Sequence, residues 1–292
     1  MTPSSEPRTV TPGEQAILAD LGARHALWPE DAAIVTLARG GENTTFAVAD
    51  CVVRINEDRE AVDREVALLH ALAEATPLAT PVPLVHDAAL GLIVYRTLPG
   101  EPLLRRPQRC STGVVDALTQ VLGALRELPV AQQLPRDDHP NDAWHADAVE
   151  NFRAAQAHFE PRHAAAVASF LSDQPPPTRD LVVPQHNDLG AEHLLADPEG
   201  GVTGIIDWTD AARADPARDL GLLYRDLGSD VAFAIAAGLD GPLTDDERAR
   251  IRFHARCKWL EDFRYAVDEP DTRAVYLANC LWTFDHTFWS PG

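Results

Sequence analysis

The stretch from Leu181 to Gly221 constrains the fold of this chain more than any other segment. Two short apolar runs lie in it, Leu181–Val183 and Val202–Ile206, and Pro and Gly residues bound them. Such runs predict buried strands. Asp188 follows the first run, and Asp207 comes directly after the second. Because a side chain just past a strand end is held on a rigid frame, we expect both carboxylates to be positioned for chemistry.

The residues before this stretch predict a β-rich unit with one long helix. Thr11 and Glu14 form a capping box that begins a helix running to about Leu27. Short apolar runs between turn residues predict strands at 33–38, 45–48, 51–55, 84–86 and 92–96. An apolar face recurring at helical spacing predicts a helix over 57–73. The run Leu98-Pro99-Gly100-Glu101-Pro102 interrupts the pattern and is interpreted as a domain boundary.

The rest of the chain is mainly helical by the same criteria. Helices are predicted at 112–128, 142–159, 161–173, 216–227, 230–238, 244–265 and 271–288. We therefore expect an α+β protein with an N-terminal lobe over 1–98 and a mainly helical C-terminal lobe over 99–292.

The composition limits the classes of partner. The formal net charge of −20 is spread along the chain, which argues against nucleic acid and anionic membranes and permits a cationic ligand. No apolar run is long enough to span a bilayer, and no secretory signal begins the chain. The four cysteines lack paired spacing, which favours reduced thiols and a cytoplasmic location. Lys258 is the only lysine, against 24 arginines.

The segment from His186 to His193 is similar to the catalytic loop of kinases, H-x-D-x-x-x-x-N, with His193 in place of the last Asn. Asp207-Trp208 then stands where kinases have the metal-binding Asp of D-F-G. On this pattern Asp188 is the catalytic base that faces the acceptor hydroxyl, and His193 and Asp207 hold Mg²⁺. The alternatives are that Asp188 is only a turn residue and that His193 is a loop histidine with no metal role. His186 and, at a helix start, Asp219 are predicted to support the loop.

A phosphate-binding cation is predicted at Arg54. It ends the third strand at the position of the kinase lysine of V-A-I-K, here Val52-Val53-Arg54-Ile55. Glu65 in the following helix is the preferred partner of Arg54, with Glu60 as the alternative. A surface arginine at a strand end is the competing interpretation.

Other nucleotide contacts are predicted from position alone. The turn that holds Gly41, Asn43 and Thr44 is expected to cover the phosphates through backbone amides, although its glycines do not form G-x-G-x-x-G. Tyr95 and Thr97, just before the lobe boundary, stand where a kinase hinge contacts the purine.

Together these motifs resemble the aminoglycoside phosphotransferase-like kinases. His186-x-Asp188 is similar to their HGDLHPGN loop, Gly204–Trp208 to their strand ending in I-D-W/F, and Asp215–Leu220 to their G/D-P-x-x-D-L segment. The motif over 182–221, with His193, looks closest to macrolide phosphotransferases. The resemblance implies a bilobal protein-kinase-like fold with a nucleotide between the lobes. It also implies Mg²⁺-assisted transfer of the γ-phosphate of ATP or GTP to a hydroxyl of an antibiotic or small metabolite.

The acceptor is expected to be a small cationic molecule bound by the second half of the chain, and the protein to be a monomer, with a dimer as the alternative. Carboxylates and aromatic side chains suited to an amino-sugar are assigned to this role: Asp210, Glu261, Asp262, Trp282 and Asp285. The competing interpretation places the aromatic residues in the core.

Three other functions remain open at this stage. One is a metabolic kinase acting on choline, homoserine or a sugar. Another is a nucleotide-binding protein without catalysis. The third is a non-haem iron oxygenase, because His186, Asp188 and a later histidine mimic its ligand triad.

Overall fold

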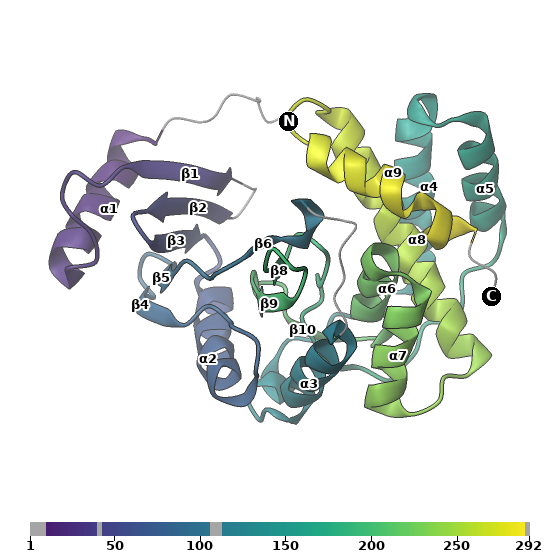
Figure 1. Cartoon of the computed structure of the whole chain (residues 1–292), viewed down its shortest axis with the longest axis horizontal. Coiled ribbons are helices and arrows are strands. Elements are labelled where there is room, and N and C mark those ends of the chain that lie inside the picture. The colour runs from purple at the N-terminus through teal and green to yellow at the C-terminus, as the bar shows by residue number, and fades with distance from the viewer. Residues whose placement is uncertain (1–9, 40–42, 106–112, 290–292) are drawn as a thin grey trace. The chain divides into compact units, whose positions relative to one another are not determined.

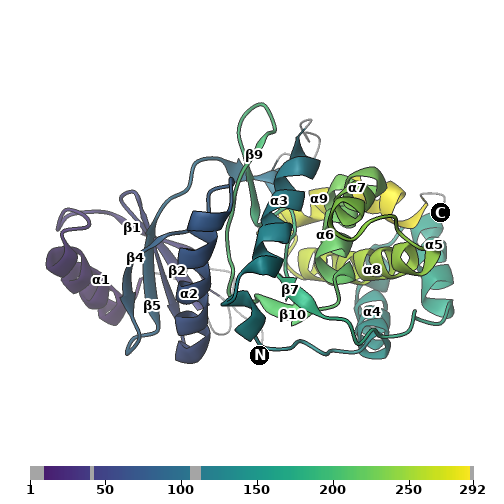
Figure 2. The same ribbon diagram turned by 90° about the horizontal axis from the view of Figure 1, so that it is seen from below.

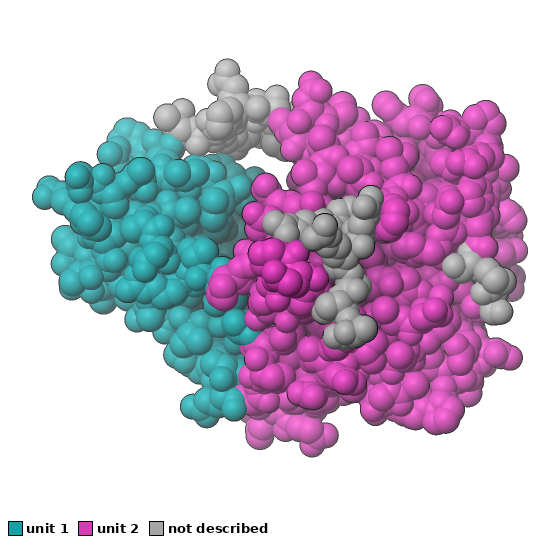
Figure 3. Space-filling view, viewed as in Figure 1, with its two compact units in different colours: residues 1–74, 79–98 teal, residues 75–78, 99–292 magenta. Residues whose placement is uncertain are grey.

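The computed structural model describes residues 10–39, 43–105 and 113–289. The chain divides into two compact units, residues 1–74 with 79–98 and residues 75–78 with 99–292 (Figure 3). The first unit carries an antiparallel sheet and the second is mainly helical, so the expected α+β fold class is confirmed. Within the described residues, no helix is both long and apolar enough to cross a membrane.

The first unit is a five-stranded antiparallel sheet between two helices (Figures 1 and 2). Its elements are α1 (Pro12–His25), β1 (Ile34–Arg39), β2 (Asn43–Val48), β3 (Cys51–Asn56), α2 (Arg59–Ala75), β4 (Pro83–Asp87) and β5 (Leu92–Arg96). The strands lie in the order β1-β2-β3-β5-β4. The capping box of Thr11 and Glu14 is present at the start of α1.

Strand alternation explains which side chains of β3 face which helix. Successive residues of a strand point to opposite faces. Val53 packs in the cluster that contains Leu18 of α1, whereas Val52 packs with Val62 of α2. Arg54, two residues after Val52, therefore lies on the α2 face of the sheet.

The second unit contains short strands and a set of packed helices. The strands are β6 (Glu101–Pro102), β7 (Val183–Gln185), β8 (Leu194–Ala196), β9 (Val202–Ile205) and β10 (Ala212–Ala214). The helices are α3 (Val114–Glu127), α4 (Asn141–Ala155), α5 (Pro161–Ser172), α6 (Ala217–Leu227), α7 (Ser229–Asp240), α8 (Asp245–Asp268) and α9 (Ala274–Phe288), with 3-10 turns η1 (Leu103–Arg105), η2 (Ala131–Gln133) and η3 (Gln156–His158). Strand β7 pairs with β10, and β8 pairs with β6 and β9.

Two sequence-based boundaries in this unit need correction. Leu181 was expected to begin the first apolar strand, but its side chain is 52% exposed and β7 begins at Val183. The helix expected over 142–159 ends at Ala155, where the chain tightens into η3.

Helix α8 is central to the second unit, since α4, α6 and α9 all pack against it. Its Trp259 is 1% exposed and stacks on Phe263 with ring centroids 4.9 Å apart. The Trp259 indole N–H donates to the Cys280 carbonyl of α9. Trp259 and Phe284 are therefore core residues.

Helices α6 and α8 approach each other closely at Gly221. A Cβ atom added to Gly221 would lie 2.7 Å from the Cβ of His254 and 2.9 Å from the backbone nitrogen of Ala255. The second contact is with backbone, which cannot rotate away. The two helices can therefore pack at this distance only because residue 221 has no side chain.

We predict that Gly221→Ala destabilises the protein by about 1–3 kcal/mol, the usual cost of overpacking a core. Gly123→Ala in α3 is the matched control, because its added Cβ would meet only Leu239 Cδ2 at 3.7 Å, an ordinary contact. That variant should be neutral or more stable by up to about 1 kcal/mol through helix propensity. Urea unfolding measures both, and equal effects would show that the α6–α8 approach is not limiting.

Candidate active site

The catalytic-loop motif occupies the connection between β7 and β8. The antiparallel pairing of β8 with β9 sets Leu194 opposite Ile205. The pairing continues one step further, where the Ile206 N–H donates to the His193 carbonyl at 3.0 Å. His193 and Asp207 are therefore neighbours because each lies at the end of one of these two paired strands.

The backbone turns sharply at two positions beside the predicted functional residues. Asn187 has φ of 70° and Asp207 has φ of 61°. Asn and Asp adopt this left-handed conformation more readily than most residues with a side chain. Such conformations outside glycine cluster at functional sites, where the surrounding structure holds them in place.

The tautomer of His193 follows from its hydrogen bond. Its Nδ1 lies 2.7 Å from the carbonyl oxygen of Asp188. A carbonyl only accepts, so Nδ1 carries the proton and donates. In the neutral ring, Nε2 then keeps its lone pair, and it lies 3.7 Å from Oδ2 of Asp207.

This arrangement fits a divalent cation. Mg²⁺ binds its ligands at about 2.0–2.1 Å, so two atoms that share one ion lie about 3–4 Å apart. Nε2 of His193 and Oδ2 of Asp207 meet that condition without a hydrogen bond between them. The carboxylate of Asp207 is half exposed, so water or a phosphate could also bind a cation held there.

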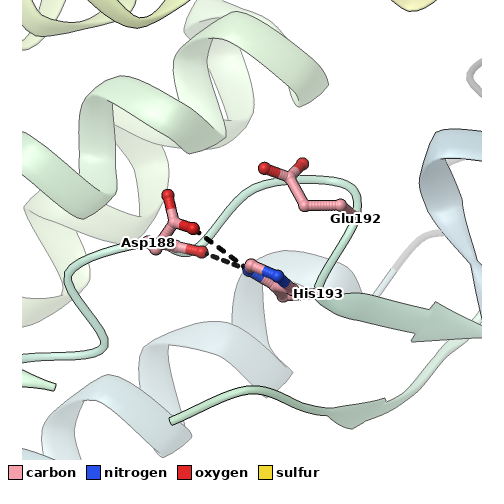
Figure 4. A group of neighbouring side chains, drawn as sticks. All are labelled: Asp188, Glu192 and His193. Atoms are coloured by element: carbon pink, nitrogen blue, oxygen red, sulfur yellow. Dashed lines mark hydrogen bonds and ion pairs between the residues drawn. The ribbon is translucent and has the colours of Figure 1, made fainter. Parts of the chain in front are cut away.

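Glu192 offers an alternative ligand. One potential ligand atom from each of Asp188, Glu192 and His193 lies within 4.8 Å of the others (Figure 4). However, Oε2 of Glu192 is 3.3 Å from a guanidinium nitrogen of Arg225, so its charge already has a partner. Burial also raises the pKa of Glu192, which weakens it as an ionised ligand. We therefore favour the pair of His193 and Asp207.

Asp188 lies between the imidazole of His193 and the ammonium of Lys258. Its Oδ2 is 3.6 Å from Nδ1 of His193, and its Oδ1 is 3.6 Å from Nζ of Lys258 on α8. Burial opposes ionisation of Asp188, but the charges of Lys258 and His193 outweigh it, and the pKa of this carboxyl is lowered. Asp188 is therefore a carboxylate at neutral pH and can accept a hydroxyl proton.

His186 and Asp219 fix the catalytic loop through hydrogen bonds. Asp219, in the first turn of α6, accepts the backbone N–H groups of His186, Asn187 and Leu189. The Nε2–H of His186 donates to the Ile206 carbonyl at 2.9 Å. Both side chains are fully buried. Burial lowers the pKa of His186 to about 4, helped by the charge of His193, so its ring is neutral.

A buried ion cluster on the other side of the loop was not expected from the sequence. Arg225 of α6 is 1% exposed and pairs with Asp226, Asp262 and Glu192. Asp226 in turn accepts the Ala191 N–H at 2.7 Å. The cluster thus fixes the second half of the catalytic loop. Its members are spread over three segments of the chain, and no local motif marks them.

The predicted phosphate-binding pair lies in the first unit. Arg54 and Glu65 form an ion pair, and both side chains are buried. Glu65 faces the sheet because it is three residues from Val62 on the same face of α2. The alternative partner, Glu60, approaches Arg64 instead.

The other predicted nucleotide contacts need adjustment. Asn43 and Thr44 are not turn residues, because β2 begins at Asn43 and pairs with β3 from that residue. Gly41 lies outside the described residues. Tyr95 is buried against Val52 on the α2 face, and the Thr97 N–H already donates to the Asp50 carbonyl.

The predicted acceptor-binding residues do not lie together. Trp282 and Asp285 are on the exposed side of α9, whereas Asn279 on the buried side of that helix donates to Asp226. Asp262 is turned toward Arg225 and belongs to the buried ion cluster. Glu261 is half exposed and lies 3.0 Å from Nζ of Lys258.

The pKa of Asp210 depends on two of the predicted site residues. Partial burial and the charges of Asp188 and Asp207 raise the pKa of Asp210.

A cavity of about 420 Å³ lies beside Glu261, between α4 and α8. Its walls carry carboxylates, one indole and a few neutral groups: His139, Trp144, Asp147, Ala148, Glu150, Asn151, Cys257 and Glu261. The volume is in the range of small-molecule sites. Of the predicted acceptor residues, only Glu261 lines it.

The sequence model of the phosphotransferase enzyme family (APH) matches residues 33–254. This match covers most of the chain, including the β3 arginine, the catalytic loop and Asp207. The chain belongs to the phosphotransferase enzyme family.

Solved structures with the same fold include antibiotic phosphotransferases. Aminoglycoside 2'-phosphotransferase-IIIa in complex with GDP has a TM-score of 0.63 and 17% identity, over 94% of this chain and 99% of that one. Macrolide 2'-phosphotransferase type I has a TM-score of 0.59 and 20% identity, with the same shares covered. Macrolide 2'-phosphotransferase MphH from Brachybacterium faecium has a TM-score of 0.56 and 22% identity, again over 94% and 99%. These similarities show the protein-kinase-like fold of this phosphotransferase.

A curated relative matches over a short segment. The uncharacterized protein YcbJ of Bacillus subtilis (strain 168) is 50% identical over 42 residues, which are 14% of this phosphotransferase and 13% of the relative. The match thus spans about an eighth of that relative's length.

We predict that His193 makes metal binding sensitive to acid. Burial lowers the pKa of His193, but the charges of Glu192, Asp188 and Asp207 outweigh it, and the net shift is upward. A protonated ring has no lone pair for a metal, so below this raised pKa each pH unit should cost about tenfold in Mg²⁺ affinity. The half-saturating Mg²⁺ concentration for nucleotide turnover, measured from about pH 8 to about pH 6, checks this.

His193→Asn is the control for that experiment. It should stay active with a flatter pH dependence, because an amide oxygen does not titrate in this range. His193→Ala should need far more Mg²⁺. Wild-type metal dependence in His193→Ala would show that His193 is only a loop residue.

Proposed function

We propose that this phosphotransferase transfers the γ-phosphate of ATP or GTP to a hydroxyl group of a cationic antibiotic of the aminoglycoside or macrolide type, and thereby inactivates it. The observation that carries the proposal is the arrangement of Asp188, His193 and Asp207 at the ends of paired strands. An ionised carboxylate stands next to an imidazole–carboxylate pair with the spacing of metal ligands. These are the groups that phosphoryl transfer requires.

Asp188 acts as the base in this proposal. It orients the acceptor hydroxyl and takes its proton as the oxygen attacks the γ-phosphorus. The fixed loop and the depressed pKa of Asp188 suit this role, because the carboxylate is held in place and is ready to accept.

His193, through Nε2, and Asp207, through Oδ2, would hold Mg²⁺. When bound, the ion neutralises phosphate charge and orients the phosphate chain. His186 and Asp219 maintain the positions of both ligands, because one reaches the residue before Asp207 and the other accepts from the loop.

Arg54 is proposed to bind the nucleotide phosphates. The ion pair with Glu65 fixes the guanidinium, whose planar set of donors matches phosphate oxygens. Arginine here fills the role that lysine has in protein kinases.

The cavity between α4 and α8 is proposed as the acceptor site. Glu261 in its wall contacts Lys258, and Lys258 contacts Asp188, so the cavity begins within two side-chain contacts of the base. Asp147 and Glu150 add negative charge, and Trp144 offers an aromatic surface. Such a lining suits a ring that carries ammonium groups. The similarity in fold to aminoglycoside and macrolide phosphotransferases supports the same class of acceptor.

We predict that a susceptible bacterial host expressing this chain grows at raised concentrations of at least one amine-bearing antibiotic in a panel of aminoglycosides, macrolides and nucleoside antibiotics. Asp188→Asn should abolish the protection, because loss of a general base costs about 10²–10⁴-fold in rate. Purified Asp188→Asn should still bind nucleotide with wild-type affinity.

Two results would contradict the proposal. Absence of protection across the panel, with turnover of choline, homoserine or a sugar by the purified protein, would replace the antibiotic by a metabolite. More than half of the wild-type rate in Asp188→Asn would show that Asp188 is not the base.

A further inference from the structure

Lys258 lies at the centre of the groups that the proposed reaction uses, although it belongs to no catalytic motif. It is on α8, seventy residues after Asp188 in the chain. Its Nζ is 3.0 Å from Oε2 of Glu261 and 3.6 Å from Oδ1 of Asp188. The ammonium also lies over the ring of Trp144, 5.6 Å from its centroid. The lysine therefore contacts the proposed base and two residues, Glu261 and Trp144, that line the proposed acceptor cavity.

The contacts of Lys258 leave part of its ammonium available. A lysine ammonium has three N–H donors. Glu261 is within hydrogen-bond distance, but the separation from Asp188 is longer than a hydrogen bond. The side chain of Lys258 is 17% exposed.

Arg225 is the other basic side chain whose ion pairs reach the described catalytic loop, and it is differently engaged. Its guanidinium is 1% exposed and is surrounded by Glu192, Asp226 and Asp262. It can stabilise the loop but cannot reach a substrate. Of Lys258 and Arg225, Lys258 is thus the one whose side chain is partly exposed and lies beside Asp188.

In the proposed transfer step, negative charge lies on the phosphoryl oxygens next to the acceptor oxygen. In the transfer step the acceptor oxygen forms a bond to the γ-phosphorus as the bond to the β–γ bridging oxygen breaks. The hydroxyl proton passes to Asp188, and the nucleoside diphosphate leaves with the electron pair. The phosphoryl group in transit carries charge on its three equatorial oxygens, next to an acceptor oxygen that is held by Asp188.

We infer that Lys258 is a catalytic residue of this phosphotransferase, whose ammonium contacts the phosphoryl group during its transfer from the nucleoside triphosphate to the acceptor. The inference rests on the proposed phosphoryl transfer, and it assigns to α8 a role that the sequence motifs do not contain. The ammonium forms ion pairs with Asp188 and Glu261, and the ring of Trp144 makes a cation–π contact with it.

Lys258→Met tests this inference, because it keeps the length of the side chain over Trp144 and removes the charge. With Mg²⁺ and ATP or GTP, and water as the acceptor, the release of inorganic phosphate should fall by about 10²–10³-fold, the usual effect of losing one donor to transition-state charge. The KM for the nucleotide and the melting temperature should stay close to the wild-type values. Lys258→Arg should recover part of the rate.

A second measurement reports the transition state directly. The wild-type protein should bind the nucleoside diphosphate with Mg²⁺ more tightly when aluminium fluoride, a mimic of the phosphoryl group in transit, is added. Lys258→Met should lose that gain while binding the diphosphate alone as well as the wild type does. Because Lys258 is the only lysine, ¹⁵N-lysine labelling gives a single side-chain ammonium signal, which should shift when the fluoride is added.

Arg264→Ala is the matched control. Arg264 is on the same helix and pairs with Asp268 at the surface, so its loss removes one positive charge from α8 without touching the site. It should leave hydrolysis and fluoride-dependent binding unchanged.

The outcomes separate the two proposals. If the wild-type protein neither binds nor hydrolyses ATP or GTP, the proposed function fails, and the role of Lys258 fails with it. If the wild type hydrolyses nucleotide and Lys258→Met does so at more than half its rate, with undiminished fluoride-dependent binding, only the role of Lys258 is overturned.

Discussion

The catalytic loop depends on one buried carboxylate. Asp219 is completely enclosed, and it accepts the N–H groups of His186, Asn187 and Leu189. Burial raises its pKa to about 7, and the three backbone donors act against that rise. A loop of polar backbone inside a protein needs partners for its N–H groups, and an acceptor at the first turn of a helix supplies several at once. The orientation of Asp188, in the middle of this segment, follows from that arrangement.

Two groups of charged residues contact the catalytic loop. In the first group, the guanidinium of Arg225 pairs with Glu192, Asp226 and Asp262, and the Asp226 carboxylate accepts the Ala191 N–H. Arg225 and Asp226 are buried, so removing a partner of either one would leave an uncompensated charge and loosen the loop.

In the second group, Lys258 and His193 each contact Asp188, and His193 also contacts Asp207. The side chains of this second group are partly exposed, and they comprise the Lys258 ammonium and the potential ligand atoms of His193 and Asp207. The same helix, α8, supplies both Asp262 and Lys258, and the close approach of α6 at Gly221 sets its distance from the loop.

Site residues that lie close in the sequence, at the ends of strands that pair, can be predicted from the sequence. Asp188, His193 and Asp207 lie within one short stretch, and hydrogen-bonded pairing of β8 with β9 converts their spacing into proximity. Local patterns also predicted the sheet, the helices and the Arg54–Glu65 pair, because strand and helix periodicities fix which side chains face each other.

Residues that meet only through packing were missed. Lys258 was visible as the single lysine, but nothing in the sequence indicates that α8 brings it to Asp188. The pairing of Asp262 with Arg225 likewise cannot be seen in a residue pattern. Trp282 is exposed on α9, and its assignment to the acceptor stays a prediction. The start of β2 at Asn43 was misjudged because its turn-forming residues were given more weight than their pairing with β3.

We propose that Nε2 of His193 and the carboxylate of Asp207 share one divalent ion next to Asp188. Electron spin echo spectroscopy of Mn²⁺, bound in place of Mg²⁺ with a non-hydrolysable nucleoside triphosphate, can detect such a ligand. We expect a nitrogen modulation in the wild type that changes to the ¹⁵N pattern on ¹⁵N-histidine labelling and is lost in His193→Asn, which still binds the ion. A Mn²⁺ signal without histidine nitrogen coupling in the wild type would contradict it.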